Sequence, residues 1–184
     1  FICVHDNSYL DDFYRIIKST ETRQGISLRN KDYFKRIMDA FGSDANMYIA
    51  RVNVDKFSEF LCCEINKSKD EALIAKYKSQ LEDCKKAKEK YGNVISIAAT
   101  LAITPPNKKG IKKVEYLYAG TFEDVFPYLN TNASVHINSF IDMLNRGYDY
   151  ADLEGVDGTF DDNISKTKAK YNPVVLEFVG EFDM

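Results

Sequence analysis

The chain has 184 residues, a formal net charge of −3 and an apolar fraction of 45%, with 12 Tyr and 12 Phe. This composition is sufficient for one packed domain with at most one appendage. The longest apolar runs, such as VISIAATLAI, are far shorter than the roughly 18 residues of a membrane span, and no signal peptide is visible.

Cysteine usage bears on the compartment of the protein. Cys3, Cys62, Cys63 and Cys84 show no paired spacing, and the chain has only two histidines. The sequence therefore predicts reduced thiols, a cytoplasmic location and no metal site. Because the chain begins with Phe1 rather than Met, we expect a fragment of a longer protein.

The first part of the chain predicts a strand, two helices and a second strand. FICV is a short apolar strand, and the apolar residues that follow recur at helical spacing, with Ser8 as the expected N-cap and Gly25 as the stop. A second helix, NKDYFKRIMDAFG, ends at Gly42. The segment NMYIARVNV then alternates apolar and polar residues, which is typical of a half-buried strand.

Residues 55–92 predict an inserted helical arm. The segment before Ser68 has helical spacing, although a strand at 61–65 is an alternative. Ser68 and Glu71 have the spacing of a capping box, which marks the start of a second, lysine-rich helix. This helix packs either against the preceding segment, as an antiparallel coiled-coil arm, or continues it as one bent helix. Its apolar seam has a 3-4-3 spacing typical of coiled coils and contains Ile74, Tyr77, Leu81 and Cys84.

The second half predicts two strands, a helix and two further strands. VISIAATLAIT and KKVEYLYAG form the strands of a meander, and 132–147 forms a helix. YADLEGV is a strand, DGTFDDNISKTKAK a polar loop and PVVLEFVGEF the final strand. The sequence thus predicts an α+β domain over 1–54 and 93–184, with a mixed sheet. The expected apolar face of the helix contains Val135, Ile137, Phe140, Ile141 and Leu144.

Basic residues are concentrated in three clusters. Residues 67–92 contain eight Lys against five acidic residues, although the chain as a whole is negative. Such clusters indicate either contact with a polyanion or charged surfaces that favour solubility. The other two clusters contain Lys108, Lys109, Lys112 and Lys113, and Lys166, Lys168 and Lys170.

The order of elements resembles the acyl-CoA N-acyltransferase (GNAT-like) fold, which alone does not determine function. An acetyl-CoA-dependent member needs a glycine-rich turn before the helix that follows the meander, because backbone N–H groups there hold the pyrophosphate. Here the junction is AGTFEDVFPYLNTNAS, and it places Glu123 and Asp124 at the expected phosphate position. We therefore expect no acetyl-CoA binding and no other cofactor.

Four segments, in order along the chain, resemble the FemA/FemX/MurM family, whose members build the interpeptide bridges of peptidoglycan. The opening DDFYRIIKSTETRQGISLRNKDYFKRIMDAFG resembles the helices that begin the family's second GNAT-like domain. EYLYAGT is similar to its Tyr-Leu-Tyr-Gly-Gly strand end, and NRGYDYADLEGVDG to its Gly-x-x-x-Tyr-Asp-Phe-x-Gly-Val-x-Gly segment. KAKYNPVVLEFVGEFDM resembles its closing strand.

The resemblance implies an aminoacyltransferase. Because complete family members have two such domains, it also implies that this chain is the second domain, with its arm, of a longer two-domain protein. The family transfers an amino acid from aminoacyl-tRNA to a stem-peptide amine of a muropeptide precursor, which is nucleotide- or lipid-linked and implies transient proximity to a membrane surface. The arm would then reach RNA, or would equally pack on a neighbouring domain. The alternative function is a non-catalytic GNAT-like domain whose arm recognises RNA or a protein. A small-molecule acetyltransferase is disfavoured by the junction at 119–134.

The resemblance also implies site residues. Lys168 matches the family's lysine that would stabilise charge developing on the carbonyl oxygen, although Thr167 replaces the usual Phe before it. Tyr118 and Glu154, at strand ends, are expected to face the substrate cleft; the alternatives are a core position for Tyr118 and a surface acid for Glu154. His136 is expected to be a buried, hydrogen-bonded histidine rather than a base. The expected RNA-binding face of the arm contains Lys78, Lys85, Lys86, Lys88 and Lys90.

Overall fold

The structure is a computed structural model that describes residues 1–106, 110–156 and 159–176. It contains two compact units, Phe1–Asp152 and Leu153–Met184, and each is described by itself. The basic residues Lys108 and Lys109 lie outside the described residues.

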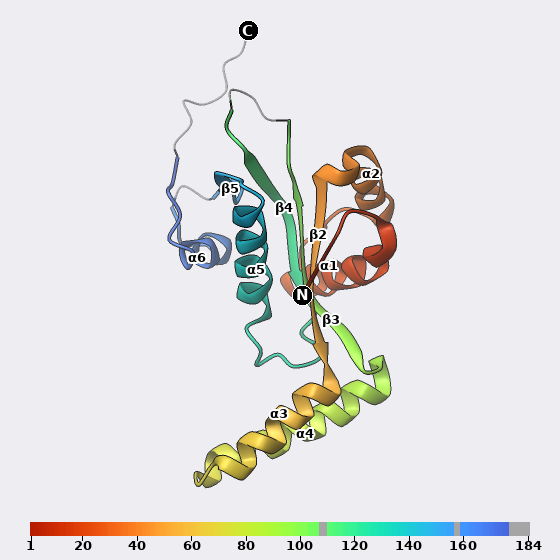
Figure 1. The fold of residues 1–184 in the computed structure, drawn as a ribbon, viewed down its shortest axis with the longest axis vertical. Helices are drawn as coiled ribbons and strands as arrows, with labels where there is room; N and C mark the ends of the chain where they lie inside the picture. Colours follow the sequence, from red (N-terminus) through yellow and green to blue (C-terminus); the bar gives the residue numbers. More distant parts are fainter. Residues whose placement is uncertain (107–109, 157–158, 177–184) are drawn as a thin grey trace. The chain divides into compact units, whose positions relative to one another are not determined.

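The first unit is built on a five-stranded sheet with the order β1-β2-β3-β4-β5 (Figure 1). Neighbouring strands are antiparallel from β1 to β4, and β4 and β5 are parallel. The β2–β3 register shifts between Ala50 and Arg51, where β2 continues toward the next helices. The sheet is therefore mixed, as the sequence predicts. Its strands are β1 (Ile2–Val4), β2 (Ala45–Asn53), β3 (Val94–Ile103), β4 (Lys113–Thr121) and β5 (Tyr150–Asp152).

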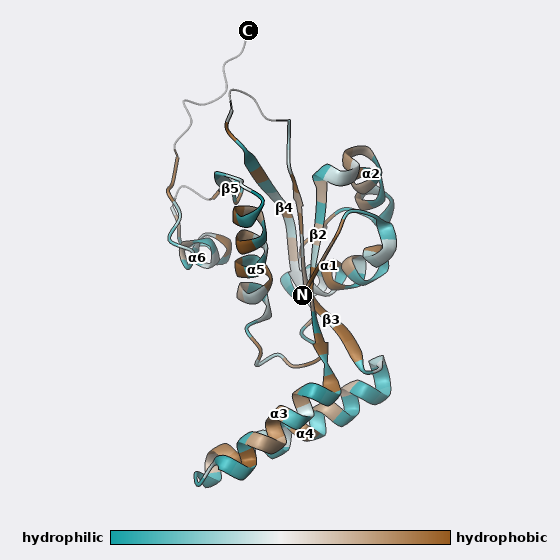
Figure 2. Cartoon of the chain, viewed as in Figure 1, coloured by the Kyte–Doolittle hydropathy of each residue, from teal (hydrophilic) through white to brown (hydrophobic). Residues whose placement is uncertain are grey.

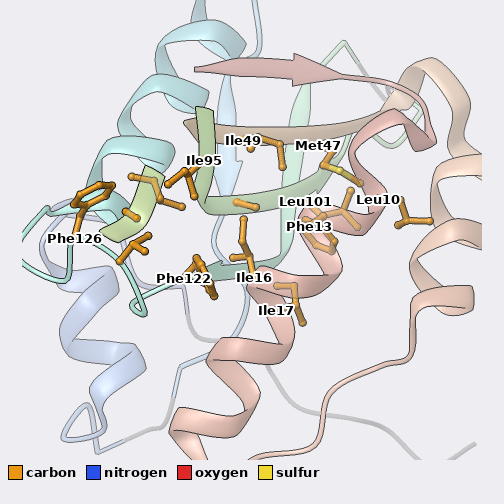
Figure 3. Packing of buried hydrophobic residues seen from close by; sticks show 14 of the residues in the cluster. Leu10, Phe13, Ile16, Ile17, Met47, Ile49, Ile95, Leu101, Phe122 and Phe126 are labelled. Carbon is orange, nitrogen blue, oxygen red and sulfur yellow. The ribbon is translucent and has the colours of Figure 1, made fainter. Parts of the chain in front are cut away.

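Two helices, α1 (Leu10–Gln24) and α2 (Lys31–Phe41), cover one face of this sheet (Figure 1). Their apolar side chains pack on alternate residues of the central strands, since successive strand residues point to opposite faces. Figure 3 shows this core. Its members include Leu10, Phe13, Ile16, Ile17, Met47, Ile49 and Leu101, each at most 5% exposed.

The start of α1 differs from the sequence prediction. Ser8 does not cap this helix, because it lies inside a short 3₁₀ helix, η1 (Asn7–Tyr9), whose own cap is Asp6. The Asp6 carboxylate accepts the N–H of Ser8 (2.8 Å). The chain therefore enters α1 at Leu10 directly from a preceding turn, without a side-chain cap.

The opposite face is covered by α5 (Thr131–Asn145), which follows β4 (Figure 1). Here the contacts are partly polar. Tyr48 donates its hydroxyl hydrogen to Asp142 Oδ2 (2.6 Å), and Tyr116 donates to Ser139 Oγ (2.9 Å). Burial and the neighbouring Asp142 carboxylate raise the pKa of Tyr48, so this buried hydroxyl stays protonated.

The predicted apolar face of α5 is wrong in part. Val135 is buried as expected, but the other buried positions are His136, Ser139 and Met143. The sheet presents tyrosine hydroxyls to this helix, so the helix must turn polar acceptors toward them. As a consequence, three of the apolar residues assigned to the core are exposed: Ile137 (48%), Ile141 (52%) and Leu144 (71%).

Residues 54–91 form two helices, α3 (Val54–Lys67) and α4 (Glu71–Tyr91), that lie side by side beyond the ends of β2 and β3 (Figure 1). The non-helical connection over 68–70 excludes a single bent helix, and the strand considered at 61–65 is excluded because these residues lie inside α3. The capping box is also wrong, because the N-cap of α4 is Asp70 rather than Ser68. The Asp70 carboxylate accepts the N–H groups of Ala72 (2.9 Å) and Leu73 (3.2 Å), and its charge favours a helix N-terminus.

The buried stripe of α4 overlaps the predicted seam in part. Cys84 is 1% exposed, but the other buried residues of this helix are Gln80 and Ala87. Tyr77 and Leu81 are half-buried and pack against the core cluster. The buried residues of α4 differ from the predicted seam because this helix packs against α3 and, at its C-terminal end, also against β3 and the segment after β4.

The second unit contains α6 (Asn163–Ala169), where the sequence predicts a polar loop. That prediction is wrong because Asp162 caps a helix there, accepting the N–H groups of Ile164 (2.7 Å) and Ser165 (2.9 Å). The sequence predicts a final strand over 173–182. Residues 173–176 form no strand, and residues 177–182 lie outside the described residues. Within the described part of the chain, no helix has the length and apolar character to cross a membrane.

Candidate functional site

The carboxyl end of β4 is an unpaired edge of the sheet. Only Lys113–Glu115 of β4 pair with Tyr150–Asp152 of β5, and β5 ends at Asp152, so beyond Glu115 this edge of β4 has no strand partner among the described residues. In open sheets that contain parallel strands, ligands bind beyond the carboxyl ends of the strands. The end of β4, residues 116–121, is therefore the candidate site.

Tyr118 lies at this end, on the face covered by α1 and α2. Its ring packs edge-on against Phe34 (5.0 Å between centroids), and its hydroxyl lies 3.4 Å from the Tyr33 hydroxyl. The Arg29 guanidinium lies 5.3 Å from the centroid of Tyr33. Burial and the Tyr33 hydroxyl raise the pKa of Tyr118, whereas Arg29 acts in the opposite direction. The ring of Tyr118 thus packs in the core, whereas its hydroxyl lies beside the Tyr33 hydroxyl and the Arg29 guanidinium.

The segment that follows β4 is packed rather than open. Phe122, Val125 and Phe126 are buried, and Phe126 has a positive φ of 52°. The Phe126 ring contacts Phe57 of α3 edge-on (5.6 Å), and Phe122 contacts Tyr91 of α4 (5.4 Å). Aromatic side chains therefore occupy the segment where a CoA-binding member needs a glycine-rich turn.

Acidic residues in the same segment further disfavour a phosphate ligand. Glu123 forms an ion pair with Arg23 and accepts a hydrogen bond from Thr121 Oγ1 (3.1 Å). Arg23 Nη2 in turn donates to Thr121 Oγ1 (3.1 Å). The Arg23 guanidinium is thus already paired with a carboxylate at the end of β4.

The five predicted RNA-binding lysines are all exposed on α4. Lys85 pairs with Glu82 (2.6 Å), and Lys88 pairs with Asp55 of α3 (2.6 Å). Residues 54–91 contain nine lysines against eight acidic residues, a net charge of only +1. The helix pair is therefore less basic than α4 alone, and Figure 2 shows hydrophobic residues (brown) between its hydrophilic ones (teal).

Lys168 and Glu154 come together inside the second unit. Lys168 Nζ donates to the backbone oxygens of Glu154 (3.1 Å) and Gly155 (2.6 Å). Glu154 is exposed and has a positive φ of 66°, a conformation that non-glycine residues adopt only when neighbouring contacts stabilise it. The ammonium group thus ties α6 to the turn at 154–155.

His136 and Cys84 have structural environments. His136 is 8% exposed, with Nδ1 2.9 Å from the Asn132 oxygen, and burial lowers its pKa. It is therefore the buried, hydrogen-bonded histidine that the sequence predicts. Cys84 is buried, and burial raises the pKa of its thiol, which makes it unreactive.

Sequence reasoning missed Arg29 and Tyr33. Both lie within the segment compared with the family's opening helices, but nothing in their spacing links them to Tyr118, 85 residues further on. The link arises because α2 packs beside β4. The sequence did contain a signal for the start of α2, because Asn30 is a typical N-cap residue. Its side chain accepts the N–H of Tyr33 (2.9 Å) and places Tyr33 in the first turn of α2.

Comparison with known structures defines the class of fold. The chain is similar to an aminoglycoside acetyltransferase from an uncultured soil metagenomic sample, with a TM-score of 0.56 and 7% identity over 100% of this chain and 93% of that one. It is also similar to a ribosomal-protein-alanine N-acetyltransferase from Brucella melitensis biovar Abortus 2308, with a TM-score of 0.53 and 9% identity over 100% and 97% of the two chains. These likenesses place the chain in the GNAT-like acyltransferase fold.

The family follows from the sequence. The FemAB family matches residues 4–73 and 64–184, and the chain belongs to this family. A crystal structure of FemX is similar with a TM-score of 0.61 and 20% identity, over 88% of this chain and 46% of that one. The chain therefore spans about half the length of FemX. A comparison with curated proteins found no match.

Proposed function

We propose that the chain is part of an aminoacyltransferase that moves an amino acid from aminoacyl-tRNA to a stem-peptide amine of a peptidoglycan precursor. Membership in the FemAB family and the likeness to FemX support this proposal. In the reaction, the amine attacks the ester carbonyl, the new C–N bond forms, and the C–O bond to the tRNA breaks. The proton lost by the amine passes to the departing ribose oxygen. No atom changes its oxidation state, so the reaction needs no redox cofactor.

The observation that carries the proposal is the group of Arg29, Tyr33 and Tyr118 at the carboxyl end of β4. Two hydroxyls and a guanidinium converge there beside the aromatic ring of Phe34. Muropeptide precursors carry carboxylates and phosphates, and guanidinium groups bind both through charge-assisted hydrogen bonds. We assign this group to the acceptor, with Arg29 holding an anionic group and Tyr118 donating a hydrogen bond.

Lys168 is proposed to stabilise the oxyanion that forms on the ester carbonyl, with Glu154 nearby as a substrate contact. This role requires the ammonium group to exchange a backbone oxygen for the substrate oxygen. The same contacts favour the alternative function, a non-catalytic binding domain, because an ammonium that already holds two carbonyls can be purely structural. The two functions differ in the effect of removing Lys168.

The test measures transfer of a labelled amino acid from charged tRNA to a nucleotide-linked muropeptide by the full-length protein. Arg29→Gln should raise KM for the muropeptide with little change in kcat, whereas the exposed Arg36→Gln on α2 should change neither. Lys168→Ala should lower kcat by roughly 100-fold, about 2.7 kcal/mol.

Lys166→Ala and Lys170→Ala are the matched controls for Lys168, since both lie on or beside α6. Equal and small effects of all three substitutions would assign Lys168 to the surface of the second unit. Absence of transfer by the unmodified protein, with tRNA binding retained, would instead establish the binding domain, in which the α3–α4 pair recognises RNA.

A further inference from the structure

A cavity of about 710 Å³ runs along one side of the α3–α4 helix pair. The two helices lie side by side (Figure 1), and the cavity lies between residues 54–62 of α3 and residues 78–88 of α4. Its volume falls within the range of pockets that hold small ligands. We call this cavity the arm groove.

Small side chains leave the arm groove open. Ser58 and Cys62 lie one turn apart on α3, and the Ser58 hydroxyl donates to the Val54 oxygen of its own helix (2.8 Å) rather than reaching across to α4. Val54 and Cys84 are each 1% exposed, and Leu81 is half-buried. These side chains give the groove an apolar floor, where larger residues would fill the space between two paired helices.

The rim of the arm groove on α4 is cationic. Lys85 pairs with Glu82 (2.6 Å), and Lys88 pairs across the groove with Asp55 (2.6 Å). The side chains of Lys85 and Lys88 remain 73% and 50% exposed, and ion pairs this exposed are weak enough to exchange one anion for another. Lys78 has no ion pair within the described part of the chain. Three ammonium groups therefore face two carboxylates, which favours a ligand with a negative charge.

The length of the arm groove indicates the form of the ligand. From Lys78 to Lys88, α4 rises by about 15 Å, which is close to the length of an extended chain of roughly twelve carbons. An apolar floor below a charged rim fits a ligand with an apolar body and one polar end. We propose that the arm groove binds an anionic amphiphile, a single unbranched acyl chain with a carboxylate or phosphate at its end. The chain belongs either to a free fatty acid or to an anionic membrane lipid.

This site is independent of the proposed transfer reaction. Neither the group of Arg29, Tyr33 and Tyr118 nor Lys168 lines the arm groove. Three lysines of its rim are also expected RNA contacts, so the experiments that test the amphiphile contain no RNA. Failure of amphiphile binding would therefore leave the transfer reaction standing, and loss of transfer would leave the amphiphile site standing.

Two neighbouring thiols test the proposal in the full chain. Cys62 and Cys63 are both exposed on α3, but only Cys62 lines the arm groove. Dodecanoate at about ten times its Kd, below its micelle-forming concentration, should slow alkylation of Cys62 by iodoacetamide roughly tenfold and leave Cys63 unchanged. Cys63→Ser and Cys62→Ser each leave one of the two thiols to be followed by mass spectrometry. Equal protection of both thiols, or no protection of Cys62, would overturn the proposal.

Matched ligands and matched variants separate the charged end from the chain. Dodecyltrimethylammonium has the same chain and the opposite charge, and octanoate has the same charge and a shorter chain; each should bind roughly tenfold more weakly than dodecanoate or worse. Lys78→Gln should weaken dodecanoate binding by roughly threefold to tenfold, whereas Lys76→Gln, outside the groove on the same helix, should not change it. Equal binding of the two dodecyl compounds, or equal affinity of the two variants, would contradict an anionic ligand.

Filling the arm groove tests its location without the thiol. Cys62→Phe should abolish the heat of dodecanoate binding in calorimetry, because the aromatic ring occupies the space of the chain. Cys63→Phe is the matched control, since it adds the same ring at an exposed position outside the groove. Unchanged binding in Cys62→Phe, or equal loss of binding in both variants, would place the ligand elsewhere and overturn the proposal.

Lipid vesicles decide the source of the chain. Protection of Cys62 by vesicles that contain phosphatidylglycerol, but not by phosphatidylcholine vesicles, would assign an anionic membrane lipid. Protection by dodecanoate without protection by either vesicle would assign a free fatty acid. Protection that rises with protein concentration in the absence of any ligand would instead assign the arm groove to a second copy of the chain and overturn the proposal.

Discussion

Gly120, near the end of β4, has no room for a side chain. A Cβ there would lie 2.8 Å from Thr20 Oγ1 and 3.2 Å from Ile16 Cγ2, because α1 crosses the strand at this point. Thr20 uses this close approach to bond Thr121 twice, donating to its oxygen (3.2 Å) and accepting its N–H (3.0 Å). In the sequence, Gly120 was only part of a motif, and the structure gives it a packing reason.

We therefore expect Gly120→Ala to destabilise the protein by about 1–3 kcal/mol, since α1 must shift and the paired bonds of Thr20 weaken. Chemical denaturation of the full chain measures this change. Gly155→Ala is the matched control, because a Cβ at Gly155 meets no atom of the described residues within 4 Å. Equal stability of the two variants would show that α1 adapts to a Cβ at no cost.

At the scale of the element, α5 contains apolar residues of which some are buried and others are exposed. Met143 and Leu144 are adjacent and similar in volume, yet Met143 is 2% exposed and Leu144 is 71% exposed. Met143→Ala should lower the free energy of unfolding by roughly 2–4 kcal/mol, whereas Leu144→Ala should change it by less than about 0.5 kcal/mol. Thermal or denaturant unfolding of both variants checks the difference. A larger loss in Leu144→Ala would reverse the assignment of the buried face.

The helix pair α3–α4 allows a test of RNA contact that spares its own ion pairs. Replacing Lys78, Lys86 and Lys90 with Gln leaves the Lys85–Glu82 and Lys88–Asp55 pairs intact. If this face contacts tRNA, each lost phosphate contact should reduce the salt dependence of binding by somewhat under one unit of slope, with thermal stability nearly unchanged.

Leu81→Ala is the converse variant for the helix pair, because it loosens the packing and keeps the charge. It should lower thermal stability and leave the salt slope of tRNA binding unchanged. Binding is measured by fluorescence anisotropy over a range of salt concentrations. An unchanged slope in the triple Gln variant would make the helix pair a packing element rather than an RNA contact.

At the scale of the whole molecule, the chain has a GNAT-like fold, but the segment between β4 and α5 has no glycine-rich turn that could hold the pyrophosphate of CoA. Phe122, Val125 and Phe126 fill the segment after β4, and Glu123 adds negative charge. Calorimetry with acetyl-CoA should therefore show no saturable heat. The ribosomal-protein-alanine N-acetyltransferase of similar fold is a suitable comparison protein. Micromolar affinity for acetyl-CoA in this chain would contradict the assignment of the junction.

The sequence by itself determined the order and type of most elements and the family. Apolar periodicity was sufficient for β2, β3 and β4 and for the first two helices, because local patterning and core burial agree in those segments. It was also sufficient for the helical character of residues 54–91. The motif order from α1 to the end of the chain carried the family resemblance, which the FemAB match confirms.

Only the tertiary structure decided which faces and which distant residues come together. The buried face of α5 depends on the hydroxyls of Tyr48 and Tyr116, which lie on other elements, so no pattern within α5 could predict it. The convergence of Arg29 with Tyr118 likewise depends on how α2 packs across the sheet. Periodicity records how residues are spaced along one element, whereas a site is formed by contacts between elements that the spacing does not encode.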